Sequence, residues 1–240
     1  TFMYSQEESA HLQKVAFQKN SQLLKPNSGI IYDKVSFLNE NRLIRFRKYI
    51  SKFNDFDEFS LHLNEVLNNF SFGIDADKFE SALKSIGEML GYISQRPDQE
   101  IRKGPDNLWC ASNKKYAIFE CKSEVDENRG AIKKSEAGQF NNHCGWFKTE
   151  YDEYVDVLRV IVIPTKKLAR DADFTDEVFV MRKNGVKKLK DNIKNFMKEI
   201  KKYEIESITD TKLQKYFDMY NLNIDNFIGN YVEEIYHLEK

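Results

Sequence analysis

The residues with the clearest chemical potential are two acids and a lysine that lie close together in the chain. Asp106 follows Gly104 and Pro105, and Glu120 and Lys122 come at the end of an apolar run. Paired carboxylates bind hard cations such as Mg²⁺. An ammonium group beside them can orient or deprotonate a water molecule and offset phosphate charge. These residue types therefore favour metal-assisted hydrolysis.

A β-hairpin would bring the two acids together. Residues 107–111 and 115–122 have the composition of short strands, and a polar turn separates them. If the turn centres on Asn113, Asp106 lies opposite Glu120. Directly opposed like charges are unfavourable in a sheet unless a divalent cation lies between them or one carboxyl is protonated.

Alternation along the second strand determines which side chains share a face. Glu120 and Lys122 are two residues apart, so we expect both to project to the same face. Cys121 lies between them and is expected to point the other way, into the core. The lysine ammonium would then lie beside the metal site.

This pattern resembles the PD-(D/E)xK nuclease superfamily, whose motif corresponds here to Pro105-Asp106 followed by Glu120-x-Lys122. Glu80, on a predicted helix over residues 78–90, matches the acid that this superfamily places on the helix before the hairpin.

Gln139, on a predicted helix over residues 131–151, is similar to the glutamine that the superfamily often carries after the lysine. His143, one turn later, departs from the tyrosine of some branches.

The resemblance implies a restriction-endonuclease-like core, an α/β fold with a mixed central sheet flanked by helices. It also implies that Mg²⁺ or Mn²⁺ is held by Glu80, Asp106, Glu120 and the carbonyl of Cys121. Lys122 would position the water and Gln139 would support the site.

Residues 79–146 look more specifically like the nuclease-like domain at the C-terminus of some bacterial and archaeal DEAD/DEAH-type helicases. The chain begins at Thr1 and contains no phosphate-binding GxxxxGK[ST] loop. We therefore expect that it is a piece of something longer, and that any helicase motor lies elsewhere in the same protein or in a separate subunit.

Each of these residues also has an ordinary structural interpretation. Asp106 could be a turn residue, Glu120 and Lys122 a solvated strand pair, and Glu80 an acid favoured by a helix N-terminus. Gln139 could be a surface residue. The histidines show no spacing typical of zinc ligands.

Lysines suggest where phosphate could bind. Residues 182–202 hold nine Lys and Arg against Asp191 and Glu199, which is nine minus two, a net charge of +7. We expect DNA contacts from Lys133 and Lys134, which lie beside the site in the sequence, and from Lys187, Lys188 and Lys190 in the basic segment.

Trp146 and Phe147 are expected in the core rather than stacked on a base.

The elements that must position the site are mostly helices. Ten Gly and four Pro in 240 residues are few turn-forming residues. Apolar spacing predicts helices over 38–54 and 56–70, which would form an N-terminal helical annex (1–73) before the nuclease-like domain (74–240). Glu80, on the 78–90 helix, shares a face with Leu83, Gly87 and Gly91. The two glycines would allow this face to approach the sheet closely.

After the hairpin, the helix over 131–151 and a β-branched strand at 155–163 predict a βαβ crossover. A further strand at 178–182 and helices at 186–203 and 211–238 complete this interpretation.

Composition narrows the class of protein. The chain has 37 Lys and Arg against 38 Asp and Glu, and 41% of its residues are hydrophobic, which excludes disorder as the main state. No apolar run is long enough to span a membrane. Cys110, Cys121 and Cys144 form no CxxC pair, which favours a reducing compartment and predicts a cytoplasmic location.

We therefore expect a Mg²⁺-dependent DNA nuclease that acts with a helicase or in a DNA-processing or defence system. The alternative is a catalytically inactive nuclease-like fold that binds nucleic acid or docks a partner. A sugar- or nucleotide-handling α/β enzyme is disfavoured because the chain lacks a Gly-rich strand-to-helix turn.

Overall fold

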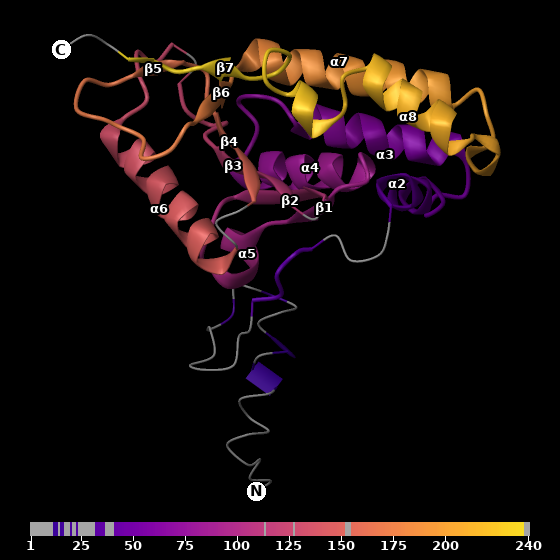
Figure 1. The fold of residues 1–240 in the computed structure, drawn as a ribbon, viewed down its shortest axis with the longest axis horizontal. Helices are drawn as coiled ribbons and strands as arrows, with labels where there is room; N and C mark the ends of the chain where they lie inside the picture. Colours follow the sequence, from indigo (N-terminus) through magenta and orange to yellow (C-terminus); the bar gives the residue numbers. More distant parts are fainter. Residues whose placement is uncertain are drawn as a thin grey trace, which may run out of the picture.

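A mixed six-stranded sheet forms the centre of the protein (Figure 1). The computed structural model describes residues 12–13, 15–16, 20, 23, 32–36, 41–112, 114–126, 128–151 and 155–237. The sheet has the order β1 (Ile93–Gln95), β2 (Asn107–Ser112), β3 (Lys115–Cys121), β4 (Asp156–Val162), β6 (Phe179–Met181) and β7 (Glu233–Glu234). The middle strands β3, β4 and β6 are parallel, and β1, β2 and β7 are antiparallel to their neighbours. β5 (Lys167–Leu168) and β8 (Tyr236–His237) form a separate parallel pair.

Helices cover both faces of this sheet, which confirms the α/β class. The described helices are α2 (Arg42–Ile50), α3 (Phe56–Asn69), α4 (Ala76–Met89), α5 (Pro97–Ile101), α6 (Lys134–Glu150), α7 (Lys183–Ile200) and α8 (Asp210–Met219), with 3₁₀ turns at Ile205–Ser207 and Ile224–Asn226. α6 lies against one face, whereas α2, α3, α4, α7 and α8 gather on the other (Figure 1). Within the described residues, no helix combines the length and apolarity needed to cross a bilayer.

The two faces of β3 pack into two different hydrophobic clusters. Phe119 and Cys121 belong to the cluster under α4 and α7, while Tyr116 and Ile118 belong to the cluster under α6. Because side chains alternate along a strand, Glu120 faces α6, and the prediction that Cys121 points into the core on the other side is confirmed.

The hairpin has the predicted register over most of its length. Leu108 pairs with Ile118 and Cys110 with Tyr116, and the register shifts by one residue between Cys110 and Ser112, next to the turn. The predicted turn centre, Asn113, lies outside the described residues. The predicted βαβ crossover is also confirmed, because α6 joins the parallel strands β3 and β4.

α4 approaches the sheet closely at one glycine. Asp75 caps the helix by accepting a hydrogen bond from the Lys78 N–H. A Cβ atom on Gly87 would lie 2.5 Å from Nε1 of Trp109 on β2, so the prediction of close approach there is confirmed. For Gly91 the prediction was wrong: its backbone, with φ +80°, abuts the carbonyl of Arg42 on α2 rather than the sheet.

The predicted helix over residues 211–238 was too long. α8 ends at Met219, and Asn221 adopts a left-handed φ of 55°, which stops the helix. The chain then turns back so that Phe227 and Tyr231 enter the core and β7 pairs with β6.

Residues on both sides of the predicted boundary near residue 73 contribute to one hydrophobic cluster. Phe46 of α2 and Phe59 of α3 share it with Phe79 of α4 and Phe196 of α7. The helices of the proposed annex thus cover the same core as the sheet; the boundary itself stays a prediction.

Candidate active site

The predicted acids meet at one edge of the sheet, where β2 begins and β3 ends. Asp106 directly precedes β2, and the residue is 7% exposed. Its Oδ2 accepts a hydrogen bond from the backbone N–H of Cys121 at 2.6 Å. Because Cys121 adjoins Glu120, this bond places Asp106 beside the second acid.

Glu120 is completely buried and lies between two nitrogen groups. Its Oε2 is 2.6 Å from Nδ1 of His143 on α6, and its Oε1 is 2.7 Å from Nζ of Lys122. The lysine contact is an ion pair without hydrogen-bond alignment, so Oε1 has no hydrogen-bond partner.

His143 is a site residue that the sequence interpretation did not assign. The available signal was its spacing: it lies four residues after Gln139, so both project from the same face of α6. That face points towards the end of β3, and Nζ of Lys122, the residue after this strand, donates a hydrogen bond to Oε1 of Gln139 at 3.1 Å. The structure therefore brings Gln139, Lys122, Glu120 and His143 together.

The electrostatics keep Lys122 charged. Burial lowers the pKa of its ammonium, but the Glu120 carboxylate and then Asp106 outweigh this effect, and the net pKa is raised. In this arrangement Lys122 is suited to orienting a water molecule and offsetting negative charge rather than to removing a proton.

Asp106 is in the opposite situation. Burial, followed by repulsion from Glu120 and Glu80, raises the pKa of Asp106 well above its usual value. Burial also raises the pKa of the Cys121 thiol, which keeps it protonated. Only the carbonyl of Cys121 therefore suits the ligand role predicted for this residue.

Glu80 lies near the acids but is held by another residue. Its Oε2 is 2.5 Å from Nη2 of Arg96. Nη1 of the same arginine donates to Oδ1 of Asp77 at 2.9 Å and to Oγ of Ser81 at 2.7 Å. Burial raises the pKa of Glu80, and Arg96 only partly offsets this effect. Arg96 had not been singled out from the sequence.

The donors suit a hard cation. Asp106 and Glu120 offer carboxylate oxygens, and Oε1 of Glu120 is buried without a hydrogen bond. Mg²⁺ typically binds one or two carboxylates and keeps several waters. Within the part of the chain that the structure describes, no three His, Cys, Asp or Glu side chains form a ready-made cage, so two carboxylates with waters describe the fit best.

The predicted DNA-binding lysines divide into two groups. Lys133, Lys134 and Lys187 are exposed. Lys188 is exposed as well, and its Nζ donates to Oδ1 of Asn230 at 2.9 Å, whereas Lys190 is partly buried with its Nζ 2.6 Å from Oγ of Ser71. Lys190 is therefore the least available of the five for contact with DNA.

The aromatic residues of α6 pack against the protein. Phe147 is buried and stacks on Tyr151, and Trp146 packs edge-on against Tyr32. Gly104 lies so close to Trp146 that a Cβ would meet the indole at 2.6 Å. The predicted core position is confirmed for Phe147, and Trp146 is partly buried and packs against the same cluster.

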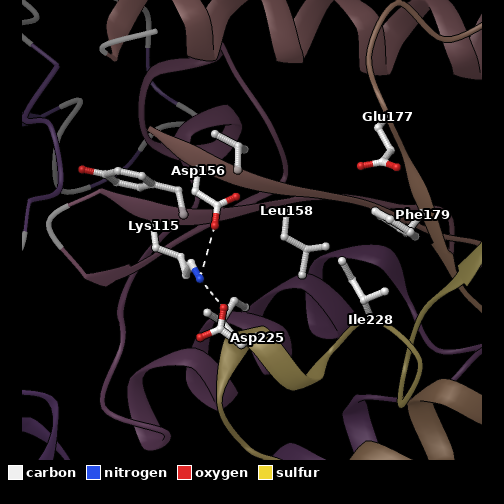
Figure 2. Close-up of a pocket in the computed structure, with 10 residues that line it drawn as sticks. Lys115, Asp156, Leu158, Glu177, Phe179, Asp225 and Ile228 are labelled. Carbon is white, nitrogen blue, oxygen red and sulfur yellow. Dashed lines mark hydrogen bonds and ion pairs between the residues drawn. The ribbon is translucent and has the colours of Figure 1, made fainter. Parts of the chain in front are cut away.

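A cavity of about 130 Å³ lies elsewhere, at the beginning of β3 and β4 (Figure 2). There Lys115 lies between the carboxylates of Asp156 and Asp225, and Leu158 and Ile228 form apolar walls. Two carboxylates already neutralise this lysine, so the cavity adds no reactive group to the site.

Comparison of the chain with protein-family models, with curated proteins and with solved structures finds no match. A functional conclusion therefore depends on the arrangement of Asp106, Glu120 and Lys122 at the end of the hairpin.

Proposed function

We propose that this protein is a Mg²⁺- or Mn²⁺-dependent deoxyribonuclease with a restriction-endonuclease-like core of the PD-(D/E)xK type. The observation that carries the proposal is the meeting of two buried carboxylates, Asp106 and Glu120, with Lys122 beside them. A bound cation would relieve the repulsion between these carboxylates, and such a group is suited to phosphodiester hydrolysis.

Asp106 and Glu120 would hold the cation, with the carbonyl of Cys121 and with Glu80 if it leaves Arg96. When bound, the ion would activate a water molecule and neutralise charge on the phosphate. Lys122 would hold that water and stabilise the developing negative charge, and Gln139 keeps the ammonium in place through its 3.1 Å hydrogen bond.

The substrate would approach over exposed lysines. Lys133 and Lys134 lie at the N-terminus of α6, and Lys187 lies in the first turns of α7. The near-zero net charge of −1 argues against tight DNA binding by the domain alone. A helicase motor, in the same protein or in a separate subunit, would supply the DNA. We place this activity in the cytoplasm.

Conversion of supercoiled plasmid to nicked DNA tests the proposal. We expect Mn²⁺-dependent nicking by the wild type and at least a 100-fold loss of rate in Asp106→Asn, Glu120→Gln and Lys122→Ala. Glu65→Gln and Lys215→Ala change exposed residues elsewhere and should retain full activity. Cleavage that survives in all three site variants would contradict the proposed mechanism.

A second candidate function is DNA binding or partner docking without cleavage. It is favoured by the fact that Glu120 already contacts Lys122 and His143, and Glu80 already contacts Arg96. Retention of DNA in a gel-shift assay, together with intact DNA after long incubation in Mn²⁺, would support this alternative.

A further inference from the structure

Two successive turns of α6 contact Glu120, near the end of β3, and Lys122, directly after this strand. Gln139 bonds Lys122, and four residues later His143 bonds Glu120. Four helical residues rise about 6 Å and two strand residues about 6.6 Å, so the helix and strand spacings match. Phe140 and Cys144 are buried and hold this part of the helix on the sheet.

The contact on Glu120 selects one of its two oxygens. His143 lies 2.6 Å from Oε2, while Oε1 is buried, has no hydrogen bond and lies 2.7 Å from the ammonium of Lys122. A carboxylate with one oxygen fixed by a donor cannot rotate freely, so its second oxygen keeps a constant direction. Metal-binding carboxylates are commonly held in this way by a neighbouring donor.

We infer that His143 is a positioning residue that fixes Oε2 of Glu120 and thereby presents Oε1 to a divalent cation shared with Asp106. This inference rests on the proposed function and adds to it a residue that does not touch the substrate. Both the imidazolium and the neutral ring with a proton on Nδ1 can donate this bond.

Three substitutions separate positioning from simple packing. His143→Asn keeps a donor close to the place of Nδ1, His143→Gln moves the donor one bond further out, and His143→Leu removes it. Asn142→Leu, at the exposed neighbouring position on α6, is the matched control. Circular dichroism and thermal unfolding establish that each variant folds.

The measurement is Mn²⁺ affinity of the DNA-free protein, determined by electron paramagnetic resonance of the unbound ion. We expect 10- to 100-fold weaker binding in His143→Leu and His143→Gln. His143→Asn and Asn142→Leu should stay within about threefold of the wild type. If His143→Leu fails to fold, the Asn and Gln variants still decide, because both keep a polar amide.

Equal Mn²⁺ affinity in the wild type, His143→Leu and His143→Gln would overturn the inference and leave the proposed nuclease intact. So would an Asn variant as weak as the Gln variant. A wild type that binds Mn²⁺ no better than Asp106→Asn would instead overturn the proposed function, and the positioning role with it.

Discussion

Asp106 determines the energetics of the site at the scale of single residues. It is buried beside Glu120 and Glu80, and its one hydrogen bond, from the Cys121 N–H, does not offset their repulsion. The apo protein therefore disfavours the ionised form of Asp106 at the place where a cation would bind. Unfavourable groups of this kind are typical of functional sites.

Asp106→Asn should make the metal-free protein more stable at neutral pH. The folded-state pKa of Asp106 is raised, so the folded protein holds this proton more tightly than the unfolded chain does. Stability is therefore lost as the pH rises from the ordinary carboxyl value towards the raised one. The amide oxygen can still accept the Cys121 N–H. We expect a gain on the order of 1 kcal/mol at pH 8.

Urea unfolding in EDTA at pH 5 and pH 8 measures this effect. The gain should be larger at pH 8 than at pH 5, and added Mg²⁺ should stabilise the wild type but not the variant. A variant that is less stable than the wild type at pH 8 would contradict the conclusion that the ionised form of Asp106 destabilises the metal-free protein.

At the scale of elements, the hairpin and α4 place the acids. α4 reaches β2 at Gly87, where only a hydrogen fits against Trp109. The close packing keeps the first turns of α4, including Glu80, near the start of β2, where the side chain of Asn107 donates to the Glu80 carbonyl at 3.1 Å. The site therefore depends on helix–sheet packing several residues away.

Gly87→Ala should destabilise the fold by about 1–3 kcal/mol, because the new methyl group would overlap the indole of Trp109. Gly138→Ala on α6 is the matched control: a Cβ there meets nothing within 4 Å, so we expect a small gain of about 0.5–1 kcal/mol. Chemical denaturation of both variants checks the pair. Equal stability of Gly87→Ala and the wild type would show that the sheet and helix separate easily here.

The local pattern of apolar and turn-forming residues was sufficient to predict the hairpin and the helices around it. Alternation and turn composition predicted the register that pairs Leu108 with Ile118, and helical spacing predicted α3, α4 and α6. Contacts between distant parts of the chain were not predictable. The end of α8 depends partly on residues 227–232 packing against Gly185, whose added Cβ would lie 2.0 Å from the Tyr231 carbonyl.

The same limit applies within the site. Asp106, Glu120, Lys122 and Gln139 form a pattern that could be found in sequence order. Arg96 could not be found in this way, because its role depends on how the end of β1 meets α4.

At the scale of the whole molecule, the balanced charge is unevenly distributed. On α7, Lys187, Lys194 and Lys198 are exposed and make no ion pair within the described residues. Their spacing places them within an arc of about 40° along one side of the helix. Asp191 lies among them and reduces the positive charge of this side.

We expect this side of α7 to contact the DNA backbone. The triple variant Lys187→Gln, Lys194→Gln, Lys198→Gln should lower DNA affinity and reduce the slope of log K against log salt by about 2–3, because each phosphate contact contributes about 0.9. Asp191→Asn should strengthen binding, and Lys215→Gln should leave it unchanged. Fluorescence anisotropy at several salt concentrations measures these quantities. An unchanged slope in the triple variant would place the DNA elsewhere.

The most direct test of the central claim is the rate of plasmid nicking as a function of Mn²⁺ concentration, for the wild type and for Glu120→Gln. A shared cation at Asp106 and Glu120 predicts saturable, EDTA-sensitive nicking by the wild type and none by the variant. Wild-type protein that leaves the plasmid intact at every Mn²⁺ concentration, or a variant that nicks as fast as the wild type, would contradict the assignment of this site as a nuclease centre.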